Sequence, residues 1–291
     1  METLEQLQRK IETAHDLLSV VKTMKSLAAV NIRQYEGAAA SLDRYYVVVD
    51  TGLQALFREQ AEIPQRHVKK HAVYLVLGSD QGMCGQFNEV VVKYAYDHAE
   101  KLKAEGNTCV FWAAGERVHS ALEQGFGAAE FFSLPNSISG ISNKMQRIME
   151  TFATWQKQRE VGTLYIVYNR QEKKTIGYHP FMQRIFPFDD HWLEEKRKKE
   201  WPSRCIPMLG LPPAMLFEHL LHQYMFASFF RAFAQSMASE NAARLTAMQA
   251  AEKNIMEMRE KLQGTYREAR QNVITSELLD IVSGFEAVIE G

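Results

Sequence analysis

Residues 214–291 read AMLFEHLLHQYMFASFFRAFAQSMASENAARLTAMQAAEKNIMEMREKLQGTYREARQNVITSELLDIVSGFEAVIEG. The stretch contains no proline and only Gly264, Gly284 and Gly291 as glycines, so little in it would end a helix. At about 1.5 Å per residue, such a helix would extend over roughly 110 Å, several times the width of a globular domain of this size. The stretch therefore predicts a long helix that protrudes or is covered by a partner.

The N-terminal stretch, residues 1–63, has the same character. It contains no proline, and its only glycines are Gly37 and Gly52. Its apolar residues recur mostly at spacings of three and four, which is typical of a heptad seam: Leu4, Leu7, Ile11, Ala14, Leu18, Val21 and Ala28. Lys25 interrupts this seam, which indicates either a specific register or an exposed functional face. The alternative is a solvated lysine where the seam has ended.

The middle of the chain alternates strands with helices. After the Ile63-Pro64 break, residues 71–78 read HAVYLVLG, an apolar run that ends in glycine and is typical of a strand buried on both faces. We expect helices at 86–104, 115–124 and 141–158, and strands at 108–113, 128–132 and 161–169. Alternation of this kind favours an α/β domain with a largely parallel sheet. Residues 175–188 predict one more strand, at an edge where Pro180 is tolerated.

A charged, proline-rich segment precedes the last helix. It combines the run EEKRKKE at 194–200 with Pro202, Pro207, Pro212 and Pro213, which favours an exposed connector. The basic run could contact lipid headgroups or phosphate, but a solvated loop is the favoured interpretation.

These patterns together predict an α/β fold in which two long terminal helices form an antiparallel coiled coil and a Rossmann-like α/β domain is inserted between them. The expected divisions are an N-terminal coiled-coil helix at 1–63, an α/β domain at 64–190, a connector at 191–213 and a C-terminal coiled-coil helix at 214–291. The first and last form one unit.

Composition narrows the class of protein. The chain has 291 residues, 46% hydrophobic and 24% charged, as in an ordinary soluble globular protein. No segment approaches the ~18 uninterrupted apolar residues of a membrane span, so we expect membrane association only through partners. The net charge of −1 gives no reason to expect nucleic acid as a partner. The acidic, directly helical N-terminus and the odd cysteine count favour a mature protein in a reduced, cytoplasmic compartment.

The loop at residues 78–85, GSDQGMCG, is the candidate for an active site. Glycines between a strand and a helix can cradle an anion, and Cys84 near a helix N-terminus could have a lowered thiol pKa. However, the spacing matches neither the dinucleotide fingerprint nor the P-loop, and no lysine follows. A tight turn is favoured over a nucleotide site or a nucleophilic cysteine. His219 and His222 lie three residues apart with no obvious third ligand besides Glu218, so we expect no metal site, no cofactor and no catalytic residue.

Three sequence motifs occur in a recognisable order. They are KTMKSLAA at 22–29, GSDQGMCGQFN at 78–88, and a C-terminal group made of SENAARLTAM at 239–248, ARQNVITSEL at 269–278 and IVSG at 281–284. Together they resemble the gamma subunit of F-type ATP synthases over nearly the whole chain.

The resemblance implies a non-catalytic rotor. Its two terminal helices would form an asymmetric shaft inside a ring of alternating alpha and beta subunits, and its α/β domain would lie near the membrane rotor ring. Rotation would couple ion flow through the membrane sector to ATP synthesis or hydrolysis at the alpha/beta sites. The implied partners are the alpha, beta and epsilon subunits and the membrane ring. The implied location is peripheral, on the cytoplasmic face of the inner (plasma) membrane.

The family motif also implies contact residues. Arg270, Gln271 and Thr275 would engage beta-subunit loops, with Lys25 and Met24 nearby on the opposing helix. The alternative is that Arg270 pairs with Glu268 or Glu277. Beyond them the tail becomes apolar, and an exposed apolar tip needs a surrounding sleeve, as a bearing would supply. The bearing residues are Leu278, Ile281, Val282 and Phe285.

Two departures from the family pattern affect the expected partners. The loop arginine of the family is Gln81 here, and Leu209-Gly210-Leu211 stands in the place of its tyrosine-x-glutamate-proline element. Contacts to the membrane ring and to the small rotor subunit are the ones affected. The departures suggest the hypothesis of a divergent bacterial branch, such as a second, ion-pumping ATPase operon. The competing functions are an enzyme that uses the Cys84 loop and a coiled-coil scaffold.

Overall fold

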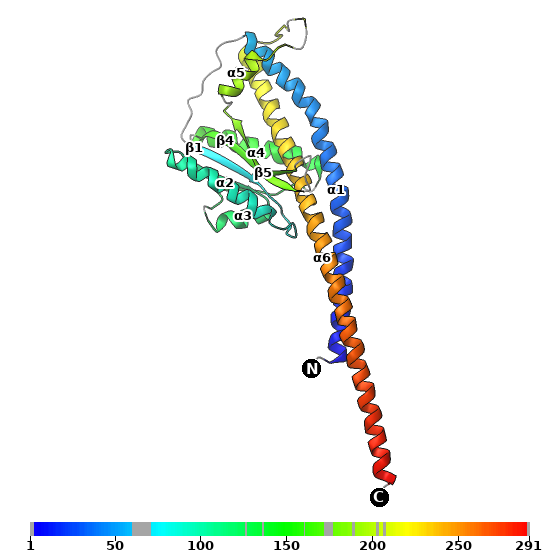
Figure 1. The fold of residues 1–291 in the computed structure, drawn as a ribbon. Helices are drawn as coiled ribbons and strands as arrows, with labels where there is room; N and C mark the ends of the chain where they lie inside the picture. Colours follow the sequence, from blue (N-terminus) through cyan, green and yellow to red (C-terminus); the bar gives the residue numbers. More distant parts are fainter. Residues whose placement is uncertain are drawn as a thin grey trace. The chain divides into compact units, whose positions relative to one another are not determined.

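The structure is a computed structural model that describes residues 3–59, 71–125, 127–135, 137–159, 161–171, 177–187, 190–201, 204–205 and 208–289. Two helices dominate it, α1 (Leu4–Glu59) and α6 (Pro213–Ile289) (Figure 1). The chain divides into two compact units that cut across both helices: Met1–Ala28 with Leu245–Gly291, and Ala29–Arg244. Both long terminal helices are thus confirmed, while the Ile63-Pro64 break lies outside the described residues. The domain bounds inferred from the sequence stay a prediction.

The first unit is a pair of antiparallel helical segments (Figure 1). The predicted seam is buried on α1, where Leu7, Ala14, Leu18, Val21 and Ala28 are each at most 8% exposed. Met248 of α6 is 5% exposed. The seam therefore continues past Lys25 to Ala28, so the lysine does not mark the end of the heptad pattern.

A five-stranded sheet forms the centre of the second unit. Its strands are β1 (His71–Leu77), β2 (Thr108–Ala114), β3 (Glu130–Phe132), β4 (Val161–Gln171) and β5 (Tyr178–Phe186), in the spatial order β3-β2-β1-β4-β5. The first four strands are parallel to their neighbours, and β5 is an antiparallel edge strand on β4. Pro180 lies on this edge opposite Asn169. The predicted largely parallel sheet and its edge strand are confirmed.

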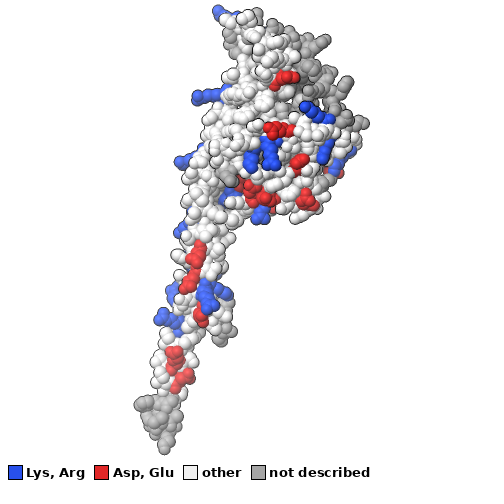
Figure 2. All heavy atoms as spheres, turned by 180° about the vertical axis from the view of Figure 1, so that it is seen from behind, with Lys and Arg blue, Asp and Glu red and all other residues white. Residues whose placement is uncertain are grey.

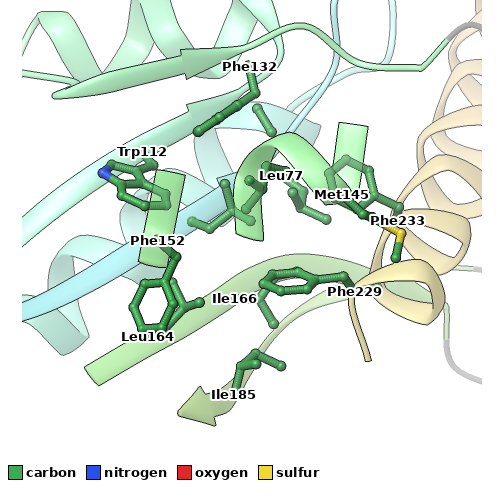
Figure 3. Close-up of a cluster of buried hydrophobic side chains, with 14 of the residues drawn as sticks. Leu77, Trp112, Phe132, Met145, Phe152, Leu164, Ile166, Ile185, Phe229 and Phe233 are labelled. Carbon is green, nitrogen blue, oxygen red and sulfur yellow. The ribbon is translucent and has the colours of Figure 1, made fainter. Parts of the chain in front are cut away.

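Helices cover both faces of the sheet. Alternate residues of β1 point to opposite sides, because side chains along a strand alternate in direction. Tyr74 and Val76 pack in the apolar cluster with α2 (Phe87–Ala104) and α3 (Glu116–Glu123). Leu75 and Leu77 pack with α4 (Ile138–Gln158) and with the α6 segment of this unit. Figure 3 shows this second cluster, in which Phe152 of α4 and Phe229 of α6 converge on strand residues. Burial on both sides explains the continuous apolar run of β1.

The charged segment before α6 differs from expectation. It forms a helix, α5 (Asp190–Lys198), rather than a loop. Glutamate, lysine and arginine are good helix formers, and Lys198 pairs with Glu194 one turn earlier at 3.1 Å. The helix is fixed to α1 because Lys196 Nζ lies 2.5 Å from Asp50 Oδ1, and Gln54 Nε2 donates to the Lys199 carbonyl at 2.8 Å. Several basic side chains of this run therefore already form ion pairs within the chain.

Candidate functional site

The glycine loop after β1 is closed by side chains of its own unit. Ser79 N donates to Asn88 Oδ1 at 2.9 Å, and Asn88 Nδ2 donates back to Ser79 Oγ at 2.9 Å. A Cβ atom on Gly78 would lie 2.0 Å from Val118 Cγ2. Gly78 is thus required for close packing of α3 against the turn, and Asn88 occupies hydrogen-bonding positions that a bound anion would need. The tight strand-to-helix turn is confirmed.

Cys84 is buried in this turn. It is 2% exposed, and Asn88 Nδ2 donates to its Sγ at 3.6 Å. Burial raises the pKa of the Cys84 thiol, and the hydrogen bond with Ser79 opposes this shift. The thiol pKa is therefore raised rather than lowered at this position, because desolvation of the thiolate is the largest effect on it. A buried, protonated thiol is a poor nucleophile.

The outer side of the loop is held by α6. Arg244 Nη2 donates to the Gln81 carbonyl at 3.3 Å and pairs with Glu240 Oε1 at 2.6 Å. Glu240 is 7% exposed. Burial raises the pKa of the Glu240 carboxyl, whereas Arg244 lowers it. The motif at 239–248 thus has a structural role that is not evident from its sequence alone. Arg244 contacts a main-chain carbonyl, which any residue at position 81 would offer.

Lys25 forms an ion pair within the first unit. Its Nζ pairs with Glu252 Oε2 of α6, and the two side chains are 33% and 18% exposed. Met24 beside it is half-buried. The heptad pattern of residues 1–63 does not by itself indicate Glu252 as the partner of Lys25. A lysine inside an otherwise apolar seam is itself a signal, because it calls for an acidic side chain on the opposing long helix.

The predicted contact residues of α6 are exposed. Every described side chain from Gln271 to Ser283 is exposed, and Arg270 is as well. Thr275 Oγ1 donates to the Gln271 carbonyl at 2.8 Å. Within the described ranges Arg270 forms no ion pair with Glu268 or Glu277, so the alternative of a local pair is not observed.

The apolar residues of the tip are exposed too. Leu278 is 57% exposed, Ile281 67% and Val282 52%. The side chain of Phe285 lies outside the described part of the structure. Figure 1 shows α6 continuing past the first residues of α1 within this unit, which leaves these side chains without a covering helix.

The histidines on α6 do not form a metal site with their neighbours. Over the described residues, no three His, Cys, Asp or Glu side chains come together in a way that could hold an ion. Charges of both signs intermingle on the face shown in Figure 2, so this face offers no extended basic patch of the kind that follows a nucleic-acid backbone.

Comparison with known proteins decides the family. A family model described as ATP synthase matches residues 3–288. The chain belongs to this ATP synthase family. The ATP synthase gamma chain of Cyanothece sp. is 28% identical over 99% of this chain and 100% of the relative. The gamma chain of Rhizobium etli is also 28% identical, with the same coverage. The expected identity as a gamma subunit, a non-catalytic component of the central stalk, is thereby confirmed.

Solved structures support the fold. A chain in the Euglena gracilis mitochondrial ATP synthase rotor matches with a TM-score of 0.66 at 16% identity, covering 93% of this chain and 98% of that one. A chain from the central stalk and c-ring of the Tetrahymena thermophila mitochondrial ATP synthase matches with a TM-score of 0.56 at 18% identity. The match covers 80% of this chain and 99% of that one. Because the chain belongs to the ATP synthase family and its relatives are gamma chains, the enzyme and scaffold alternatives are set aside.

Proposed function

We propose that this gamma subunit turns inside a ring of alternating alpha and beta subunits and that the C-terminal end of α6 is its bearing. The observation that carries the proposal is the uninterrupted exposure of α6 from Gln271 to Ser283, which includes large aliphatic side chains. A contiguous exposed apolar surface marks an interaction site on a soluble protein. A ring of subunits around the helix would bury it from all sides.

A polar band next to the tip would meet the beta subunits. Gln271, Thr275, Leu278 and Val282 follow spacings of four, three and four and so share one face of the helix. Arg270 lies beside this face with its guanidinium exposed. As the shaft turns, these groups would meet successive beta subunits and bias each nucleotide site toward a different conformation.

Met24 and Lys25 have a smaller share in this proposed contact. Lys25 already pairs with Glu252, and Met24 is half-buried. Their main role would be to keep the two helices of the shaft in register, so that torque at the tip is carried by both.

The remaining partners follow from the family. We place the epsilon subunit and the membrane rotor ring against the second unit, and the assembled complex peripherally on the cytoplasmic face of the inner membrane. No helix in the described ranges is both long and apolar enough to cross a bilayer. Arg244 contacts the main-chain carbonyl of Gln81, which supports an intact loop although Gln81 stands in the place of the family's arginine. A divergent second ATPase operon stays a hypothesis.

Co-expression with alpha and beta subunits from the same source tests the proposal. We expect a stable complex with ATPase activity, whereas the chain alone hydrolyses no ATP. In this complex, Arg270→Ala combined with Gln271→Ala should lower turnover by about tenfold, because each substitution removes a polar group from the band. The matched control is Lys157→Ala with Gln158→Ala, which removes the same kinds of exposed side chain from the end of α4. Unchanged turnover in the first variant would remove the band from the coupling role.

A further inference from the structure

A groove in the second unit has no role in the function described above. It is a partly open groove of about 690 Å³ between α4 and the N-terminal part of α6, and Phe186 of β5 also lines it. Volumes of this size are typical of binding sites rather than of packing defects.

The walls of the groove are two helix faces. The residues that α4 contributes recur at spacings of three and four, and they extend over four turns, or about 21 Å: Ser142, Gln146, Met149, Ala153 and Gln156. The α6 wall repeats the same pattern at Glu218, Leu221, His222 and Met225. Both faces therefore line the groove with side chains one helical turn apart, which is also the spacing of anchor side chains on an amphipathic helix.

The floor of the groove is a continuation of the apolar core. Phe152 and Met225 are buried, and both belong to the main cluster of the unit. Phe152 is labelled in Figure 3, where it lies among the strand residues that α4 covers. Leu221 and Phe226 are half-buried and pack against the same cluster. A floor supported by the core is pre-formed, so little ordering is needed when an apolar side chain enters.

The exposed ionisable side chains among the described lining residues are two carboxylates, Glu150 and Glu218, and one imidazole, His222. Glu150 of α4 and Glu218 of α6 line opposite walls, and no lysine or arginine is among the described lining residues. Gln146 Nε2 donates to Glu150 Oε1 at 3.0 Å, which leaves the second oxygen available. Glu218 forms no ion pair with the described residues. A basic side chain between these carboxylates would complement their negative charge.

We propose that this groove is a docking site for an amphipathic helix of a partner polypeptide, with apolar anchors one turn apart and a lysine or arginine between Glu150 and Glu218. The proposal does not depend on the rotor role, because the site lies within one unit of the chain and is testable on the isolated protein.

The test uses the full chain and a fluorescein-labelled synthetic 14-residue helix of leucine and lysine, sized on the ~21 Å length of the groove. Fluorescence anisotropy at physiological salt should show saturable binding of one peptide per chain. A peptide with the same leucines and glutamate in place of lysine should bind at least about tenfold more weakly. Two variants test the site. Glu150→Gln combined with Glu218→Gln should weaken binding of the leucine–lysine peptide by about tenfold. Ala153→Trp should block binding of the same peptide sterically.

The matched control is Glu89→Gln with Glu260→Gln, which removes two exposed carboxylates outside the groove. Equal weakening by the control variant would show non-specific charge attraction and overturn the proposal. The proposal is also overturned if the basic peptide does not bind, or if Ala153→Trp, folded by circular dichroism, binds it as well as the unmodified chain does.

Discussion

Lys25 Nζ of α1 pairs with Glu252 Oε2 of α6, and the two residues are 227 positions apart in the sequence. The pair lies where the heptad pattern would place an apolar side chain, and it is only partly exposed. A shift of one helix along the other by a turn would leave both charges partly buried without partners, which is costly. The pair therefore specifies the register of the shaft more than it contributes to its stability.

A double-mutant cycle measures this pair. Lys25→Ala and Glu252→Ala, singly and together, should show a coupling energy of about 1 kcal/mol in chemical denaturation, because the pair is partly shielded from solvent. Arg9 and Glu5 supply the comparison, since they form an exposed pair within α1 and should couple by only about 0.3 kcal/mol. A coupling for Lys25–Glu252 no greater than this would contradict the register role.

The glycine loop makes a steric prediction. Gly78→Ala should destabilise the chain by about 1–3 kcal/mol, because its Cβ would overlap Val118. Gly264→Ala should change the free energy of unfolding in the opposite direction. Position 264 is helical and has no heavy atom within 4 Å of an added Cβ, so alanine should stabilise α6 by about 0.5–1 kcal/mol. Urea denaturation distinguishes the two, and a neutral Gly78→Ala would show that α3 does not pack closely on the turn.

Glu240 makes a prediction about pH. Burial raises its pKa above the ordinary value of 4.5, so the folded protein binds this proton more tightly than the unfolded chain does. The resulting stabilisation is complete below 4.5 and is lost as the pH rises through the elevated pKa. The unfolding free energy of the unmodified chain, minus that of Glu240→Gln, should therefore fall as the pH rises above 4.5. A difference that rises with pH would mean that Arg244 outweighs burial and lowers the pKa.

The cysteines should differ in reactivity toward iodoacetamide. Cys205 is exposed, Cys109 is half-buried and Cys84 is buried. Burial also raises the pKa of the Cys84 and Cys109 thiols, which lowers their thiolate fraction. Mass spectrometry of the folded protein should find Cys205 modified first and Cys84 only after unfolding. Modification of Cys84 as fast as Cys205 would restore it as a candidate nucleophile.

The sequence predicts the elements of this chain well because their signals are local. The seam from Leu7 to Ala28 and the apolar run of β1 each carry a clear period, and burial follows that period. The run at 194–200 predicts a loop although its first five residues are helical, because a short charged helix next to prolines has no apolar period. Its formation depends on Asp50 and Gln54, which lie on a distant part of the chain.

The candidate site was predictable only in part. The family motif implies that Arg270, Gln271 and Thr275 contact the beta subunits. The structure has them exposed, and the contact itself stays a prediction. The family motif does not assign a role to Arg244. This side chain pairs with Glu240, one turn away on α6, and also contacts the carbonyl of Gln81, in a loop far away in the sequence. The groove between α4 and α6 was also missed, since its two walls come from separate elements.

Rotation of the chain within an assembled complex tests the central claim most directly. Cys205 is an exposed attachment point on the second unit, and Cys109→Ser removes the other accessible thiol. With the alpha and beta subunits fixed to a surface and a bead coupled to Cys205, we predict that ATP drives the bead in one direction, in discrete steps. A complex that hydrolyses ATP at full rate while the bead stays still would contradict the account.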